Sequence, residues 1–183
     1  AVMKAGRMTV RVDLKDFKIT YEADGKVLTG IGFRNLGYMQ YDRATLTKFP
    51  EPNYMAAQYQ PYMVAELSLD PGECVYGLGE RFTAFVKNGQ VVDVWNEDGG
   101  TASQISYKNI PFYVTSKHYG VFVDHSDNVS FEVASEKVEN VGFSVKGEEI
   151  RYHVIYGDDI KGVLETYTDL TGKPALPPAW SFG

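Results

Sequence analysis

The sequence predicts an all-β protein, an antiparallel β-sandwich, with a single α-helix near its C-terminal end. Along most of the chain, apolar and polar residues alternate over short stretches, which is the pattern of half-buried strands. In the second half, turn signals recur about every eight to twelve residues, a spacing typical of sandwiches and barrels. An aromatic content of 14% also suits strands that bury one face.

In the first third of the chain, alternation predicts strands at residues 8–14 and 17–22. Asp24-Gly25 follows as a hairpin turn, because glycine tolerates positive φ, and residues 27–31 form the returning strand. An irregular, tyrosine-rich stretch is expected from residue 34 to residue 60.

The rest of the predicted sandwich begins with a strand at residues 63–69, which Asp70-Pro71-Gly72 ends as a turn. A short strand near residue 75 leaves the sheet through two glycines. A meander of five strands is then expected at residues 111–115, 120–124, 129–134, 141–145 and 150–156.

One element has the period of a helix. Its apolar residues are Ile160, Val163, Leu164, Tyr167 and Leu170, with Asp158 or Asp159 as the N-cap and Gly172 followed by Pro174 as the stop.

These boundaries give a sandwich at residues 1–157, a linking helix at 158–171 and an extended linker at 172–183. Trp180 and Phe182 make the linker strongly apolar, so we expect it to need a partner; the alternative is a tail folded back on its own sandwich.

Composition excludes several classes of function. The 183 residues fit one globular domain, and 24 acidic against 18 basic side chains argue against nucleic acid as a partner. No apolar run is long enough for a membrane segment. Cys74 is the only cysteine, which excludes an internal disulfide and favours a reducing, cytoplasmic location.

Nucleotide binding is rejected for the glycine-containing stretch at residues 75–82. A phosphate loop would need a third glycine or a Lys-Ser/Thr pair before a helix, and neither is present. We expect Glu80 and Arg81 to form a pair that orients the loop that follows.

A long loop is predicted at residues 79–110, and loops of this length are usually lids or binding loops. It carries Trp95, Asn96, Asp98 and Tyr107, a mixture of aromatic and hydroxyl-binding side chains that suits a carbohydrate surface. The alternatives are a turn-forming role for Asp98, which precedes two glycines, and a plug role for Trp95.

No catalytic, metal or cofactor site is predicted. Residues 124–127, Asp-His-Ser-Asp, contain the residue types of a hydrolytic triad, but consecutive residues cannot aim three side chains at one another. His118 is expected in a hairpin turn and His153 on the outer face of a strand, and neither has metal-ligating companions.

Four motifs together resemble the N-terminal region of glycoside hydrolase family 31, most closely its bacterial α-xylosidases and next its α-glucosidases. The resemblance is strong from Glu73 to Gly183. The motifs are Tyr76-Gly77-Leu78-Gly79-Glu80-Arg81-Phe82, Trp95-Asn96-Glu97-Asp98-Gly99-Gly100, Tyr107-Lys108-Asn109-Ile110-Pro111-Phe112-Tyr113 and Leu176-Pro177-Pro178-Ala179-Trp180-Ser181-Phe182-Gly183.

The resemblance implies a sandwich similar to galactose mutarotase, followed by a catalytic (β/α)8 barrel of the same parent chain that carries both catalytic aspartates. It therefore implies that these 183 residues are inactive alone and that oligosaccharide binds through the parent enzyme. The long loop is expected to help form the leaving-group subsite, with Asp98 as the contact.

Gly100 stands where maltases of the family carry a hydroxyl residue, so only Thr101 can replace that contact. Arg81, Trp95 and Asn96 are expected to be loop scaffolding.

Two alternatives stay open. One is an autonomous carbohydrate-binding or structural sandwich without a hydrolytic partner. The other is a mutarotase-like enzyme, for which His153 is the only plausible strand histidine and no partner residue is found.

Overall fold

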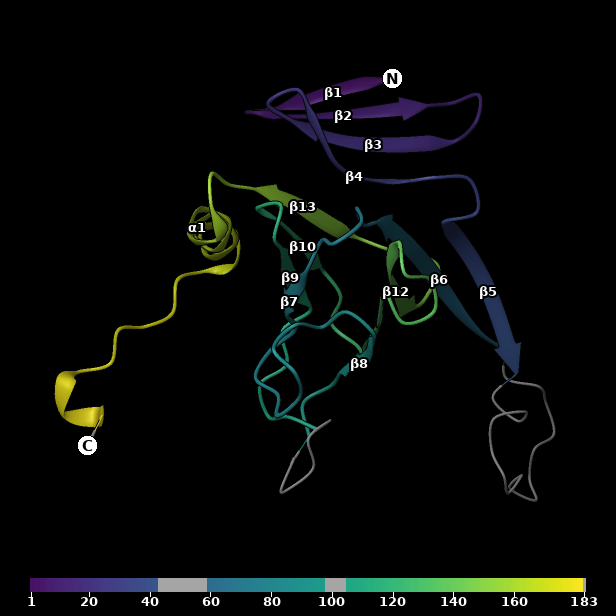
Figure 1. The fold of residues 1–183 in the computed structure, drawn as a ribbon. Coiled ribbons are helices and arrows are strands. Elements are labelled where there is room, and N and C mark those ends of the chain that lie inside the picture. The colour runs from purple at the N-terminus through teal and green to yellow at the C-terminus, as the bar shows by residue number, and fades with distance from the viewer. Residues whose placement is uncertain (43–58, 98–104, 183) are drawn as a thin grey trace, which may run out of the picture.

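The computed structural model describes residues 1–42, 59–97 and 105–182, and these form three antiparallel sheets and one α-helix. The first sheet is a meander whose strands pair in chain order, and it lies across one end of the molecule (Figure 1). Its strands are β1 (Val2–Ala5), β2 (Met8–Asp13), β3 (Lys18–Ala23) and β4 (Lys26–Ile31).

The other two sheets pack face to face as the sandwich. One has the order β13-β10-β9-β7, and the other has the order β5-β6-β12-β11-β8. Their strands are β5 (Leu36–Asp42), β6 (Tyr59–Ser68), β7 (Val75–Gly77), β8 (Gln90–Val94), β9 (Phe112–Thr115), β10 (Tyr119–Val123), β11 (Val129–Val133), β12 (Asn140–Lys146) and β13 (Tyr152–Tyr156).

The core lies between these two sheets. Along β11, every second side chain is buried and faces the opposite sheet, as the alternation requires, and Val141, Phe143 and Val145 of β12 are buried with them. Tyr113 of β9 meets Phe131 of β11 edge to face, with ring centroids 6.2 Å apart, so one aromatic pair joins the two sheets.

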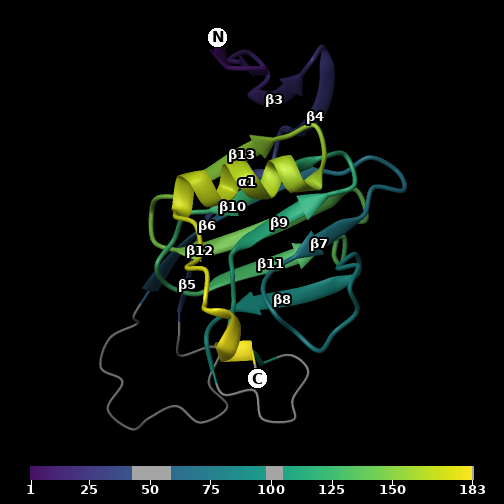
Figure 2. The ribbon, with the colours of Figure 1, turned by 90° about the vertical axis from the view of Figure 1, so that its left-hand side faces the viewer.

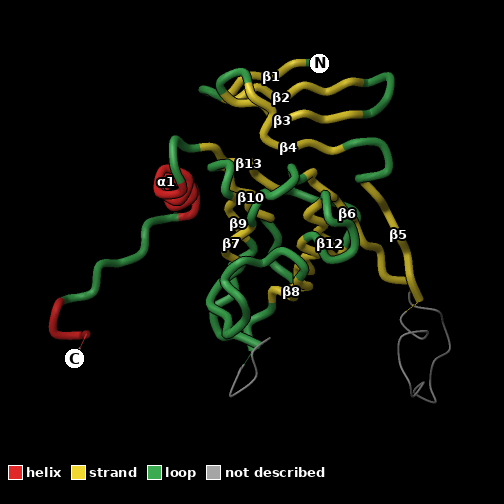
Figure 3. The backbone as a smooth tube through the Cα atoms, in the orientation of Figure 1, coloured by secondary structure: helices red, strands yellow, loops and turns green. Residues whose placement is uncertain are grey.

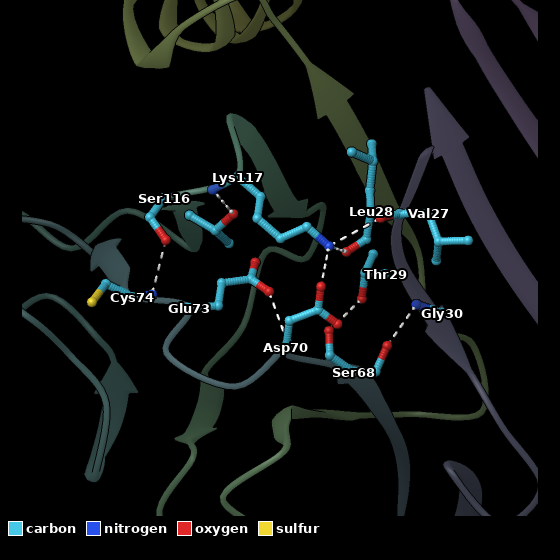
Figure 4. A network of polar contacts seen from close by, with 11 residues as sticks. Val27, Leu28, Thr29, Gly30, Ser68, Asp70, Glu73, Cys74, Ser116 and Lys117 are labelled. Carbon is cyan, nitrogen blue, oxygen red and sulfur yellow. Dashed lines mark hydrogen bonds and ion pairs between the residues drawn. The ribbon is translucent and has the colours of Figure 1, made fainter. Parts of the chain in front are cut away.

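The first sheet is fastened to the sandwich by apolar and polar contacts. Leu28 and Ile31 of β4 are buried in the common core. The Lys117 ammonium donates to the carbonyl oxygens of Val27 and Leu28 at 3.0 and 2.9 Å and pairs with Asp70 at 2.8 Å (Figure 4).

Helix α1 (Ile160–Thr171) covers the outer face of the β13-β10-β9-β7 sheet (Figure 2). Its Val163 is fully buried, and its Tyr167 ring stacks on Phe112 with centroids 4.0 Å apart. Asp159 is the N-cap, because its carboxylate accepts from the Gly162 amide at 2.8 Å. No described helix has both the length and the apolar character needed to cross a bilayer.

The segment after α1 runs away from the sandwich and ends in a short 3-10 turn at Ala179–Phe182 (Figure 3). Leu176, Trp180 and Phe182 are 95%, 82% and 74% exposed. The alternative of a tail folded back on its own sandwich is therefore wrong for the described residues.

The structure confirms the all-β sandwich and its single helix, and it differs from the sequence prediction in detail. Phe17 does not begin a strand: it lies in a turn with φ 45°, and β3 begins one residue later. Leu14 follows the end of β2 and is 78% exposed. Part of the stretch expected to be irregular forms β5, and part of the predicted loop forms β8.

Candidate functional site

The candidate site is the long segment between β7 and β9, whose two ends run side by side. Gly77, Leu78 and Gly79 all have positive φ. A Cβ on Gly79 would lie 2.3 Å from the carbonyl oxygen of Lys108, so only glycine fits this approach. The Glu80 amide donates to that same carbonyl at 2.9 Å. The two glycines therefore serve chain packing.

Arg81 holds the base of the segment together. Its guanidinium donates to the carbonyl oxygens of Leu78 and Asp93 at 3.3 and 2.5 Å and to the side chain of Asn109. Burial lowers the pKa of Arg81 below its ordinary value, and the nearby Asp93 carboxylate opposes that effect. These contacts agree with the expected scaffolding role of Arg81.

Asn109 and Asn96 complete this base. The main-chain amide of Asn109 donates to Asn96 Oδ1 at 2.9 Å. Its side-chain Nδ2 donates to the carbonyls of Trp95 and Ser106, both at 2.7 Å. Asn96 also forms a parallel bridge with Ser106. The described chain on either side of residues 98–104 is thus joined by hydrogen bonds.

Asp98 and Thr101, the two predicted substrate-binding residues, lie outside the described residues. Their predicted roles stay predictions. The structure does describe the chain beside them. The main-chain N–H of Glu97, the residue before Asp98, donates to the Ser106 carbonyl at 3.1 Å.

The expected orienting pair of Glu80 and Arg81 is replaced by a different pair. Glu80 forms its ion pair with Lys108, at 3.1 Å, on the opposite end of the segment. Both partners are exposed, so the pair adds little stability.

Lys87 is a buried cation that the sequence did not indicate. It donates to Thr83 Oγ1 and to the Ala84 carbonyl, both at 2.9 Å. Burial first, and then repulsion from Arg81, lower the pKa of Lys87 below its ordinary value. The ammonium therefore closes the turn at residues 83–87.

Aromatic side chains of this segment point outward. Phe82, Phe85, Trp95 and Tyr107 are all more than half exposed. Phe82, Phe85 and Tyr107 line a hollow of about 490 Å³, which Arg81, Lys87 and Lys108 also line. Large exposed apolar surface of this kind is typical of an interaction site.

Trp95 lies in a second hollow, of about 400 Å³, with Asp93, Glu97 and Asn128. Its side chain is 54% exposed, so it is not a buried plug. An exposed indole beside carboxylates and an amide is able to stack on a sugar ring while its neighbours bind hydroxyl groups.

The histidines do not form a second site. His118 lies in the β9–β10 turn as expected, with φ 62°. The His153 ring stacks on Phe122, and its Nε2 lies 3.8 Å from Asp124 Oδ2. Nη1 of Arg151 lies 3.8 Å from the same oxygen. Within the described ranges, no three His, Cys, Asp or Glu side chains gather in a way that could hold a metal ion.

Asn109 is the residue that sequence reasoning undervalued. Its partners Trp95 and Asn96 are 14 and 13 positions away, so no local pattern marks it. The only signal was its place inside one of the four motifs.

The sequence and the fold both match known proteins. Residues 1–132 match the model of the glycosyl hydrolase 31 N-terminal galactose mutarotase-like domain. Over 98% of its length the chain is 49% identical to an α-xylosidase of Emericella nidulans, covering 24% of that protein. It is 48% identical over its whole length to the α-xylosidase XylQ of Lactiplantibacillus pentosus, covering 22% of it.

The same fold appears in a solved structure, the GH31 dextranase FjDex31A of Flavobacterium johnsoniae complexed with glucose. The match has a TM-score of 0.79 at 23% identity and covers all of this chain and 22% of the dextranase. The chain thus spans about a quarter or less of the relatives named here. The family model, the relatives and the fold agree that this chain belongs to glycoside hydrolase family 31, as its N-terminal galactose mutarotase-like domain.

Proposed function

We propose that this chain is the accessory N-terminal domain of a retaining α-glycosidase that acts on α-linked oligosaccharides, and that the parent enzyme is an α-xylosidase. One observation carries the choice of α-xylosidase. Identity is 49% and 48% across nearly the whole chain to the two α-xylosidases, against 34% over 66% of the chain to an α-glucosidase of Saccharolobus solfataricus.

The catalytic carboxylates belong, on this proposal, to a (β/α)8 barrel elsewhere in the parent chain. Retaining glycosidases need two carboxyl groups about 5–5.5 Å apart, flanking the scissile bond. The resemblance assigns both to the barrel, so the 183-residue chain alone has no hydrolytic activity. The exposed Trp180 and Phe182 are then contacts for that barrel.

The segment between β7 and β9 contributes to the leaving-group subsite. Support comes from its construction: Arg81, Asn96 and Asn109 fix the chain at both described ends of residues 98–104. A rigid base of this kind is what a substrate contact at Asp98 or Thr101 requires, because a loosely held carboxylate cannot orient a sugar.

The test is Asp98→Ala in the full-length enzyme. We expect kcat/KM to fall about 100-fold for a disaccharide but less than about threefold for an aryl glycoside, which lacks the leaving-group sugar. The matched control is Asp16→Ala, an exposed aspartate in the β2–β3 turn on the first sheet, which should leave both substrates unchanged. Equal losses on the two substrates would refute the subsite.

Thr101→Val sharpens the same test. If the hydroxyl replaces the contact that Gly100 lacks, the variant raises KM for the disaccharide with little change for the aryl glycoside. An unchanged disaccharide KM would remove Thr101 from the subsite and leave Asp98 alone in it.

The glycone is tested separately, by the activity of the full-length protein on aryl α-xylosides and aryl α-glucosides. We expect the xyloside to be preferred. A preference for the glucoside would make the parent an α-glucosidase without changing the role of this domain.

An autonomous carbohydrate-binding sandwich is the second candidate, favoured by the exposed Trp95 and Tyr107. It predicts that the isolated chain binds oligosaccharide, whereas the accessory-domain proposal predicts that binding requires the barrel. Titration of the isolated chain and of the full-length protein with the same oligosaccharide distinguishes them.

The cytoplasmic location stays a prediction from the lone Cys74.

A further inference from the structure

Three buried polar atoms gather where the first sheet meets the sandwich. They are Oε1 of Glu73 and the hydroxyl oxygens of Tyr113 and Tyr119, and none makes a hydrogen bond to the residues that the structure describes. Glu73 is 5% exposed and both tyrosines are fully buried. Polar groups buried in this way almost always have a partner.

Strand register brings the three groups to one face. Val121 of β10 pairs with Tyr113 of β9, and Tyr119 lies two positions before Val121, so both tyrosines belong to the core face. Val75 pairs with Thr115 at the same end of the sheet, and Glu73 lies two positions before Val75. Burial is the main cause that raises the pKa of Tyr113 and Tyr119, and the negative charge of Glu73 raises the pKa of both further. The side chains of Thr29 and Thr115 are also polar neighbours of the Tyr119 hydroxyl. The three groups therefore lie near one another on the same buried face.

Neighbouring groups already have partners of their own. The other carboxylate oxygen of Glu73 accepts from the Asp70 amide at 2.9 Å (Figure 4). Thr29 donates its hydroxyl to the Ser68 carbonyl at 2.7 Å, and Thr115 Oγ1 accepts from the Lys117 amide at 3.1 Å. These contacts hold Glu73 and the threonines in place, while Glu73 Oε1 and the two tyrosine hydroxyls form no hydrogen bond with the described residues.

We propose that one internal water molecule is bound between Glu73 Oε1 and the hydroxyls of Tyr113 and Tyr119. It donates one hydrogen to the carboxylate oxygen and the other to one tyrosine oxygen, and it accepts the hydroxyl hydrogen of the second tyrosine. Three hydrogen bonds is the usual number for a buried water. The water would join the turn before β7 to strands β9 and β10, and so tie three parts of the fold together.

The first test is a high-resolution crystal structure of the full-length enzyme. We expect a density peak of one water at about 2.6–3.2 Å from all three atoms. A direct hydrogen bond between Glu73 and either tyrosine, with no peak, would overturn the proposal. A peak at about 2.3–2.6 Å with additional oxygen ligands would also overturn it, because that geometry indicates a cation.

The second test uses the sign of a mutational effect in the full-length enzyme. If the water is present, Tyr113→Phe removes one of its hydrogen bonds, and amide exchange in the β9 and β10 peptides becomes about fivefold faster. If the hydroxyl has no partner, the same variant removes an uncompensated buried group, and exchange stays equal or slows.

Two further variants complete the second test. Tyr119→Phe should act in the same direction as Tyr113→Phe. The matched control is Tyr38→Phe, whose hydroxyl is exposed and should not alter exchange in β9 and β10. Equal or slower exchange in both core variants would refute the water.

Discussion

The β9–β13 meander and the segment between β7 and β9 are both rich in aromatic residues, but they place them in opposite environments. In the meander five rings are buried, whereas in the segment four rings are exposed. The buried set is Phe112, Tyr113, Tyr119, Phe131 and Phe143, and the exposed set is Phe82, Phe85, Trp95 and Tyr107.

The difference comes from which groups form hydrogen bonds with each backbone. Strands β9–β12 make ladder hydrogen bonds, so their side chains alternate and one face must enter the core. In the segment, apart from β8, side chains such as Arg81 and Asn109 supply the hydrogen bonds instead. That arrangement fixes the backbone without directing the rings into the core, so the rings stay exposed.

The largest expected effect separates the two sets of rings. Phe131→Ala in the core should lower the free energy of unfolding by about 3–5 kcal/mol, because it removes buried contacts and leaves a cavity. Phe82→Ala, at an 85% exposed position, should change it by less than about 0.5 kcal/mol. Urea unfolding of the chain measures both. A large loss in Phe82→Ala would mean that this ring packs within the domain after all.

A smaller effect tests the start of the segment between β7 and β9, at Gly79. Gly79→Ala should cost about 2–4 kcal/mol, since its new methyl group meets backbone atoms at 2.3 and 2.8 Å and φ is positive. Gly89→Ala is the matched control, with a similar φ of 83° and nothing within 4 Å, and should cost only about 1–2 kcal/mol. Equal costs would show that the close approach to Lys108 yields easily.

The smallest effect is a pH dependence of the meander. Burial raises the pKa of Tyr119 and Tyr152 above that of an unfolded tyrosine, about 10. Their contribution to stability is therefore complete below pH about 10 and is lost as the pH rises further, by at most about 1.4 kcal/mol per tyrosine at pH about 11. Urea midpoints measured at both pH values check this. Tyr119→Phe should reduce the alkaline loss, and an unchanged loss would contradict the assignment.

Much of the fold could be predicted from the sequence because alternation is a local property. Strands β10 to β13 and helix α1 lie within a few residues of their predicted ranges. Strands β1, β5 and β8 were not predicted. β5 begins within a tyrosine-rich stretch without a clear alternation, and β8 is a short strand inside a segment dominated by turn formers.

The candidate site was predicted less completely than the fold. The motifs located the segment and named Arg81 and Asn96 as scaffolding, and the structure shows both in its base. They did not indicate that Glu80 pairs with Lys108 or that Lys87 is buried. Such pairings depend on which distant residues the chain brings together.

The β-sandwich, the helix with its caps and the family could all be predicted from the sequence, because periodicity, capping residues and motif order are local features of the chain. The packing in three dimensions settled that the first strands form a sheet of their own, which rings are buried, and that Glu73 is buried together with Tyr113 and Tyr119. Those outcomes depend on contacts between residues far apart in the sequence, and side chains of the same type become core or surface according to what packs against them.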